Sequence, residues 1–317
     1  MIPTAISPNR REYEKRVNAV IDYLRERLAE DLSLRTLARV AAFSSFHFHR
    51  VFRAITGETL FGFIQRLRVE KAATALIIHP DESVLAVALD HGFASSATFA
   101  RSFKAHFGMS ATAWRAGGAQ RWRRRQASKS NPGKQLRKAG KASKRRRPDT
   151  PRKPIEEGHM TLQVRESPPY HVAYMRYVGP YGARGIPELW TSFRKWMGTR
   201  DLPMETTIRL GVGYDDPSIT AAEKCRYDAC VVVAQDFKPD RWVNVMDLPS
   251  GKCAVYEFTG GAHEIVTAWD RAFASWLPGS GYQPDDRPCC EVYRGATMVD
   301  AKQGIFRCEL WLPVRPL

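Results

Sequence analysis

The spacing of hydrophobic residues divides the chain into a helical part and a part in which strands alternate with helices. Through most of residues 1–115 the hydrophobic positions recur with helical spacing. Over 159–317, strand-like stretches rich in Val, Tyr and Phe are interrupted by two amphipathic helical patterns, at 186–197 and 264–277. The pattern therefore predicts a multidomain protein, with an all-α domain followed by an α+β domain.

Residues 116–158 have the composition of a linker. Between 116 and 153, 15 Lys and Arg stand against a single Asp or Glu, and these cations supply most of the net charge of +16. The segment has too few apolar residues to offset the entropy lost on ordering, so we expect a flexible basic linker. It is either a solvated tether or a tether that also binds phosphate groups by releasing counterions.

The helical part contains an internal repeat. LARVAAFSSFHFHRVFRAITG at 37–57 matches ALDHGFASSATFARSFKAHFG at 88–108, and each copy has the pattern of two helices joined by a short turn. Phe48 and Phe52 of the first copy and Phe99, Phe103 and Phe107 of the second are expected to face inward, whereas Phe46 is expected to face outward. Gly92 suits the turn of the second copy. Both copies carry outward cations at matching positions, which favours two helix-turn-helix units that enter the major groove of DNA. The matching cations are Arg50, Arg53, Arg101 and Lys104.

The second copy resembles the DNA-binding domain of AraC/XylS-type transcription regulators. GFASSATFARSFKAHFG at 92–108 follows the signature of this family closely, whereas SATAWR at 110–115 departs from its usual S-P-x-x-Y-R ending. The resemblance implies two helix-turn-helix units joined by a long helix near 61–77, which bind adjacent major grooves of double-stranded DNA. Carried over by position, the implied DNA-binding residues are Ser45, Phe46, His49, Arg50, Arg53, Ser96, Ala97, Ala100, Arg101 and Lys104.

The α+β part also contains an internal repeat. AYMRYVGPYGARGIPELWTSFRKWM at 173–197 matches AVYEFTGGAHEIVTAWDRAFASWL at 254–277. This part resembles the GyrI-like effector-binding domain through VGPYG at 178–182, EVYRG at 291–295 and ELWLPV at 309–314. The resemblance implies two pseudo-repeated strand-helix-strand-strand modules around a central cleft that binds a bulky, often cationic, lipophilic effector.

Large aromatic residues are frequent in this part, which suits an organic cation held over their rings. Glu309 lies in the apolar stretch FRCELWLPV, where an unpaired carboxylate is costly, and it matches a glutamate that faces the pocket in the family. The alternative is that the aromatics fill a core and Glu309 lies on the solvent face of an edge strand. The candidate ligand-binding residues are Tyr181, Trp190, Tyr256, Trp276, Tyr293, Glu309 and Trp311.

The motifs of common enzymes and metal sites are absent from the sequence. The six cysteines form no C-x-x-C pair, His47 and His49 cannot share a helix face, and no P-loop, G-x-S-x-G, H-E-x-x-H or G-x-G-x-x-G motif occurs. The sequence also lacks a long apolar run and an apolar secretory signal. We therefore expect a cytoplasmic protein without catalytic residues, metal or cofactor.

These patterns together predict a ligand-responsive transcription regulator. A double helix-turn-helix domain over 1–115 would bind DNA, and a C-terminal domain over 159–317 would sense a lipophilic or cationic small molecule, as multidrug sensors do. RNA polymerase is a further candidate partner. The alternative is a DNA-binding protein whose C-terminal domain sequesters a toxic small molecule, or hydrolyses it with a pocket glutamate and tyrosine.

Overall fold

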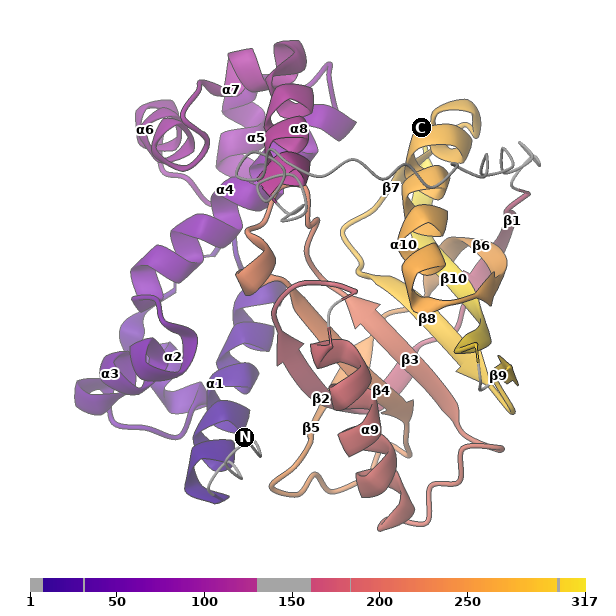
Figure 1. Cartoon of the computed structure of the whole chain (residues 1–317). Coiled ribbons are helices and arrows are strands. Elements are labelled where there is room, and N and C mark those ends of the chain that lie inside the picture. The colour runs from indigo at the N-terminus through magenta and orange to yellow at the C-terminus, as the bar shows by residue number, and fades with distance from the viewer. Residues whose placement is uncertain (1–7, 31, 130–160, 183, 301–302) are drawn as a thin grey trace, which may run out of the picture.

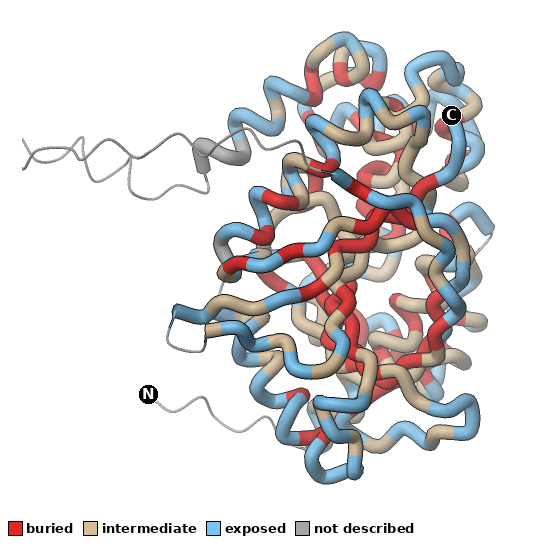
Figure 2. Tube along the Cα trace, turned by 90° about the vertical axis from the view of Figure 1, so that its right-hand side faces the viewer, coloured by how far each residue is buried: buried red, intermediate tan, exposed pale blue. Residues whose placement is uncertain are grey.

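The computed structural model describes residues 8–30, 32–129, 161–182, 184–300 and 303–317. A helical half lies beside a half built around one large sheet, and hydrogen bonds join the two (Figure 1). Buried segments run along the strands and through the middle of the helical half, with exposed segments outside them (Figure 2). The predicted fold class, an all-α domain followed by an α+β domain, is confirmed.

The helical half follows the predicted order of helices. Serines begin several of them: Ser33, Ser83 and Ser95 accept hydrogen bonds from backbone N–H groups three residues further on, at 3.1, 3.0 and 3.2 Å. The two second helices of the repeat each end at a left-handed glycine, Gly57 and Gly108. The helices are α1 (Pro8–Glu26), α2 (Leu34–Val40), α3 (Ser45–Thr56), α4 (Leu60–Ile78), α5 (Val84–Asp90), α6 (Ser96–Phe107), α7 (Ala111–Ala113) and α8 (Ala119–Lys129), with a wider helical turn at Trp114–Gly118 before α8.

The turn inside each helix-turn-helix unit requires a left-handed backbone. Gly92 has a φ of 78°, and a Cβ there would lie 2.9 Å from the carbonyl oxygen of Leu28, so the prediction for Gly92 is confirmed. The equivalent position in the first unit is Ala42, with a φ of 51°. The first unit therefore keeps a conformation that L-amino acids seldom adopt.

Each unit has its own hydrophobic core, and among the described helices α4 supplies residues to both. Phe48 and Phe52 of α3 are buried in the first core, and the predicted stripe of Phe99, Phe103 and Phe107 on α6 is buried in the second. From α4, the first core takes Phe63, Ile64 and Leu67, and the second takes Val69, Ala72, Ala73 and Leu76. The long helix thus joins two separately packed units.

The second half is a curled antiparallel sheet with the strand order β1-β6-β10-β8-β3-β4-β2-β5, to which β7 and β9 add at β10. Helices α9 (Gly185–Gly198) and α10 (Ala262–Arg271) pack on one face, and the opposite face turns toward α1 at its β2–β4–β5 end. The pseudo-symmetry of two modules stays a prediction. The strands are β1 (Gln163–Ser167), β2 (Tyr170–Val178), β3 (Ile208–Gly213), β4 (Arg226–Val232), β5 (Asn244–Leu248), β6 (Gly251–Gly260), β7 (Tyr282–Pro284), β8 (Cys289–Arg294), β9 (Met298–Asp300) and β10 (Ile305–Pro316).

The helical half extends beyond the predicted start of the linker at residue 116. Helix α8 occupies the first part of that segment, and the ring of Trp122 lies 5.2 Å from that of Phe107 and 6.2 Å from that of Trp114. One aromatic anchor therefore packs a stretch whose arginines remain exposed. The rest of the predicted linker, after residue 129, lies outside the described residues.

Replacement of Trp114 by Ala should lower the free energy of unfolding of the helical half by about 3–5 kcal/mol. Trp114 is fully buried, and its Nε1 donates to the carbonyl oxygen of Ala73 at 3.0 Å. Urea denaturation followed by circular dichroism measures the loss. Phe61→Ala is the matched control, since Phe61 is 73% exposed, and equal losses in both variants would contradict the packing described here.

Candidate functional site

The second helices of the two units, α3 and α6, present the predicted DNA-binding side chains to solvent. Both helices lie on the side of the helical half that faces away from the sheet (Figure 1). Ser45 is half-buried, and the side chain of Phe46 lies outside the described residues. The exposed members of the predicted set are His49, Arg50, Arg53, Ser96, Ala97, Ala100, Arg101 and Lys104.

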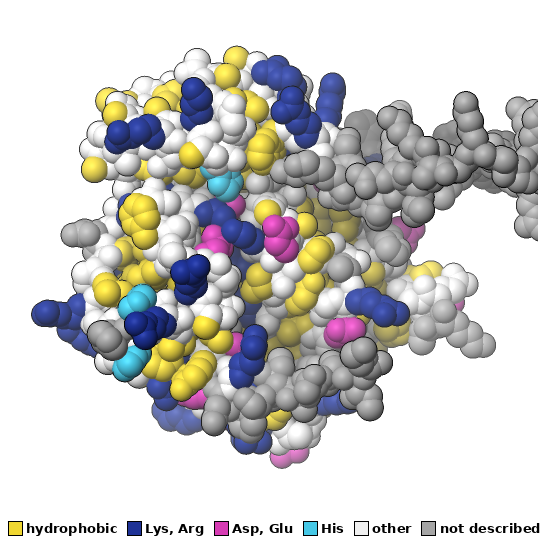
Figure 3. Space-filling view, turned by 60° about the vertical axis from the view of Figure 1, so that its left-hand side comes forward, with side chains coloured by type: hydrophobic (Ala, Val, Ile, Leu, Met, Phe, Trp, Pro, Cys, Tyr) yellow, Lys and Arg dark blue, Asp and Glu magenta, His cyan; other side chains and the backbone are white. Residues whose placement is uncertain are grey.

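The same face is rich in positive charge. Figure 3 brings this side forward, and Lys and Arg side chains are spread over it while Asp and Glu are few. Arg50, Arg53, Arg101 and Lys104 are all exposed at the matching positions of α3 and α6. A face of this kind suits the phosphate backbone of DNA, and exposed guanidinium groups on recognition helices suit the guanine edge.

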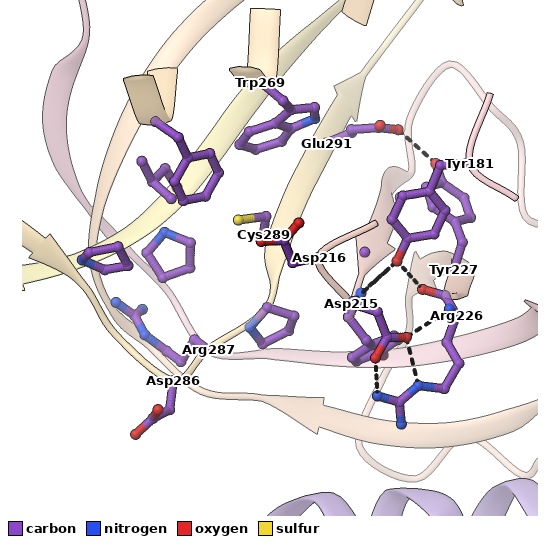
Figure 4. Close-up of a pocket in the computed structure, with 18 of the residues that line it drawn as sticks. Tyr181, Asp215, Asp216, Arg226, Tyr227, Trp269, Asp286, Arg287, Cys289 and Glu291 are labelled. Carbon is purple, nitrogen blue, oxygen red and sulfur yellow. Dashed lines mark hydrogen bonds and ion pairs between the residues drawn. The ribbon is translucent and has the colours of Figure 1, made fainter. Parts of the chain in front are cut away.

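A second candidate site is a cleft of about 2490 Å³ lined by residues of both halves. In the sheet half it lies on the face that carries α9 and α10, where Trp190 of α9 and Trp269 of α10 border it. Figure 4 shows Trp269, Glu291, Tyr227 and Tyr181 around the same space. The described residues contain no group of three or more His, Cys, Asp or Glu that could hold a metal ion.

Glu291 of β8 is the carboxylate that lies among the aromatic residues of this cleft. Its Oε2 accepts hydrogen bonds from Tyr227 Oη at 2.6 Å and from Tyr293 Oη at 2.8 Å, while Trp190 Nε1 donates to Tyr227 Oη at 3.2 Å. Burial raises the pKa of Glu291, although hydrogen bonds from Tyr227, Tyr293 and Trp269 favour its charged form. Burial and the nearby carboxylate also hold the pKa values of both tyrosines well above 10.

A glycine makes room for this pair of side chains. Gly211 of β3 lies between β4 and β8, paired with Ala229 and Glu291. A Cβ at 211 would clash with Tyr227 Oη and with Glu291 Oε2. Any other residue there would push the tyrosine away from the carboxylate, so Gly211 is part of the shape of the cleft.

The wall of the cleft next to the helical half is held by Tyr181. Its hydroxyl donates to the carbonyl oxygen of Arg226 at 2.6 Å and accepts from the N–H groups of Tyr214 and Asp215, each at 3.2 Å. The carboxylate of Asp215 in turn pairs with the guanidinium of Arg226 at 2.6 Å (Figure 4). These bonds fix the strand and the loop that border the cleft.

The structure brings three of the predicted ligand-binding residues to the cleft: Tyr181, Trp190 and Tyr293. Tyr256 and Trp276 instead pack in the hydrophobic cluster between α10 and the sheet. Trp311 is buried in a cluster on the opposite face of the sheet. None of these last three residues lines the cleft, because strand alternation or helix packing directs their rings elsewhere, and their contact with a ligand stays a prediction.

The prediction that Glu309 faces the cleft is wrong. Glu309 lies on the opposite face of β10, where its Oε1 accepts from Arg165 at 2.8 Å and its Oε2 accepts from Trp311 Nε1 at 3.1 Å. The alternative of an edge strand is wrong as well, since β10 lies between β6 and β8. Glu291 was missed by the sequence reasoning, although its spacing of two from Tyr293 places both on one face of a strand.

Replacement of Glu291 by Gln should raise the stability of the full chain at neutral pH. Because the folded-state pKa of Glu291 is raised, ionisation costs stability as the pH rises above the ordinary value of 4.5, and Gln removes that cost. Thermal denaturation should therefore show little difference between variant and parent near about pH 4 and a higher melting temperature of the variant near about pH 7. Glu309→Gln is the control, with the opposite sign expected because Arg165 loses a charged partner. A destabilised Glu291→Gln variant would contradict the assignment.

Comparison with known proteins agrees with both sites. Residues 160–315 match the model of the GyrI-like small molecule binding domain, and residues 37–117 match a helix-turn-helix domain model. The SPbeta prophage-derived protein YosT of Bacillus subtilis is 32% identical over 156 residues, which are 49% of this chain and all of YosT. The DNA gyrase inhibitor of Escherichia fergusonii is 29% identical over 161 residues, 50% of this chain and 99% of that protein.

The helical half has its own relative. The HTH-type transcriptional regulator YbfP of Bacillus subtilis is 35% identical over 103 residues, which are 32% of this chain and 35% of YbfP. No helix among the described residues is long and apolar enough to cross a membrane. The chain therefore belongs to the GyrI-like family through its C-terminal small-molecule-binding domain, and it carries an AraC-type helix-turn-helix region ahead of that domain.

Proposed function

We propose that this regulator responds to a bulky lipophilic cation held in the cleft by Glu291. The observation that carries the proposal is a half-buried carboxylate bonded to neutral donors: two tyrosine hydroxyls and an indole N–H. Among the described residues no Lys, Arg or His forms an ion pair with Glu291. A cationic ligand would supply that missing charge.

The aromatic walls favour an organic cation over a metal ion or a small hydrated ion. The rings of Trp190 and Tyr293 lie 5.4 Å apart at an angle of 70°, so one presents its edge to the other and leaves faces for a ligand. A cation over such a ring gains about 0.5–2 kcal/mol per contact, and more when water is excluded. We accordingly place the sensor domain over 159–317.

We infer that α3 and α6 bind DNA in adjacent major grooves, about one helical turn apart. Arg50 and Arg101 are placed to bind guanine O6 and N7, and Arg53 and Lys104 to bind phosphate. Ala97 and Ala100 have small side chains, so α6 contributes less sequence information than α3. RNA polymerase is the partner through which a bound regulator of this kind would act on transcription.

Replacement of Arg50 by Ala should weaken binding to the preferred duplex by about 1–3 kcal/mol and relax the base preference at one position. Lys104→Ala is the matched comparison, since loss of a phosphate contact should weaken all sequences alike and reduce the salt slope by about one. Selection of binding sites from a random DNA pool, followed by titration at several salt concentrations, measures both. A uniform loss in Arg50→Ala would rule out its base contact.

Rhodamine 6G, a fluorescent lipophilic cation, should bind the full chain and lose about 10-fold or more in affinity in Glu291→Gln, because a charged partner is lost. Binding requires the ionised carboxylate, so affinity should fall as the pH is lowered through the raised pKa of Glu291 and stay flat in the variant. Fluorescence anisotropy measures both effects. Glu309→Gln should leave the affinity within about 2-fold, since Glu309 lies outside the cleft.

The second candidate function is hydrolysis or simple sequestration of a toxic small molecule. The observation that favours hydrolysis is the same trio, because a glutamate with a raised pKa beside two tyrosines has the groups needed for general base and acid catalysis. Turnover of a reactive electrophile that is lost in Glu291→Gln would favour the hydrolase. Ligand binding with no effect on DNA affinity would favour sequestration.

A further inference from the structure

The loop between β3 and β4 enters the helical half. We name residues 215–225 the docking loop; it leaves the sheet beside the cleft and meets the helices around α4 (Figure 1). Ile219, 2% exposed, belongs to the hydrophobic core of the second helix-turn-helix unit, together with Val69 and Phe103. A residue of the sensor domain therefore completes the core of one DNA-binding unit.

Polar bonds hold the docking loop on α4. Thr220 Oγ1 donates to Glu70 Oε2 at 3.0 Å, and both side chains are buried. Lys224 Nζ pairs with Glu58 Oε2 at 3.0 Å. Arg66 lies between these two glutamates and pairs with both, at 2.9 Å from Glu58 and 3.1 Å from Glu70. The loop is thus fixed by charged groups on α4 and just before its start.

The sensor domain also forms hydrogen bonds with the first unit. Asp22 of α1 accepts hydrogen bonds from Arg176 Nη2 at 2.8 Å and from the hydroxyl of Tyr174, both on β2. Asn244 of β5 donates to the carbonyl oxygen of Lys15 at 3.0 Å. One domain therefore contacts both units, the first through α1 and the second through α4 and the core around Ile219.

Strand β4 connects these two contacts to the cleft. Three consecutive residues of β4 make different contacts, since neighbouring side chains of a strand point to opposite faces. Tyr227 points into the cleft and bonds Glu291, whereas Asp228 on the other face accepts from Arg176 at 2.7 Å. Arg226 pairs with Asp215, the first residue of the docking loop. A ligand that moves Tyr227 acts directly on the residues that hold both units.

From these contacts we propose that the sensor domain is a brace that fixes the relative position of the two helix-turn-helix units. The exposed state of α3 and α6 argues against control by covering the DNA-binding face. Two recognition helices must enter successive major grooves, so a change in their separation changes DNA affinity without any contact to the ligand. Ligand control of the brace rests on the function proposed above; the brace itself does not.

The brace is tested without ligand by the spacing of the two half-sites. Full-length protein should discriminate by about 10-fold or more between its selected duplex and the same duplex with two base pairs inserted at the centre. Thr220→Val and Asp22→Asn, singly and combined, should reduce this discrimination at least 5-fold, because α4 alone then joins the units. Glu12→Gln is the control: it removes an ion pair within α1, to Arg16 at 2.8 Å, and should keep the discrimination of the parent.

Folding is checked separately by thermal denaturation, and Thr220→Val keeps the shape of the side chain it replaces. Unchanged spacing discrimination in the folded double variant would overturn the brace. The coupling is tested next, as the ratio of DNA dissociation constants with and without saturating rhodamine 6G. The parent and Glu12→Gln should show a ratio of about 5-fold or more, and both brace variants a ratio near one. An unresponsive parent that keeps its spacing discrimination would contradict the ligand response and leave the brace supported.

Discussion

The arrangement of the two halves depends on one buried guanidinium. Arg176 is 2% exposed and lies between Asp22 of α1 and Asp228 of β4, whose side chains are 15% and 0% exposed. Burial alone would lower the pKa of this arginine, and the two carboxylates reverse that effect and raise it. Removal of one partner of such a buried pair costs about 3–5 kcal/mol, because the remaining charge stays buried without a counter-charge and without hydration. Asp22 comes from the DNA-binding part, so Arg176 has its second carboxylate partner only when α1 is in place.

The charged group in the cleft, Glu291, has neutral partners, in contrast to Arg176. Glu291 is half-buried, its partners are neutral hydroxyl and indole groups, and its pKa is raised. Gly211 leaves the space that Tyr227 Oη and Glu291 Oε2 occupy, since a Cβ at this position would clash with both atoms. Arg176 and Glu291 thus lie on opposite faces of the same sheet. Arg176 is paired with carboxylates, whereas Glu291 has only neutral hydrogen-bond donors as partners. Such an undercompensated group is typical of a site whose missing partner is a ligand.

Much of the helical half could be predicted from the sequence because its signals are local. These signals are the repeat of 37–57 in 88–108, the glycine at 92 and the spacing of the phenylalanines on α6. Each of them depends only on residues within one turn or one helix. The cleft could not be predicted equally well, since strand parity and pairing decide which face a side chain occupies. Glu309 and Glu291 both lie in apolar strands. Only the register of β10 with β8 determines that Glu309 faces away from the cleft and pairs with Arg165, whereas Glu291 faces the cleft. Nothing in the docking-loop sequence indicates that Ile219 completes a core in another domain.

The brace also bears on why the two recognition helices differ. In α3 the exposed positions carry His49 and Arg50, whereas the equivalent positions of α6 carry Ala100 and Arg101 beside Ala97. Under the DNA contacts proposed above, α6 has fewer base-contacting side chains than α3, so its position on DNA would depend more on the core that holds it. That core is the one into which Ile219 inserts. The sensor domain contacts this core through Ile219 and the first unit through Asp22, so under the proposed function a ligand that moves the docking loop would shift α6 relative to α3.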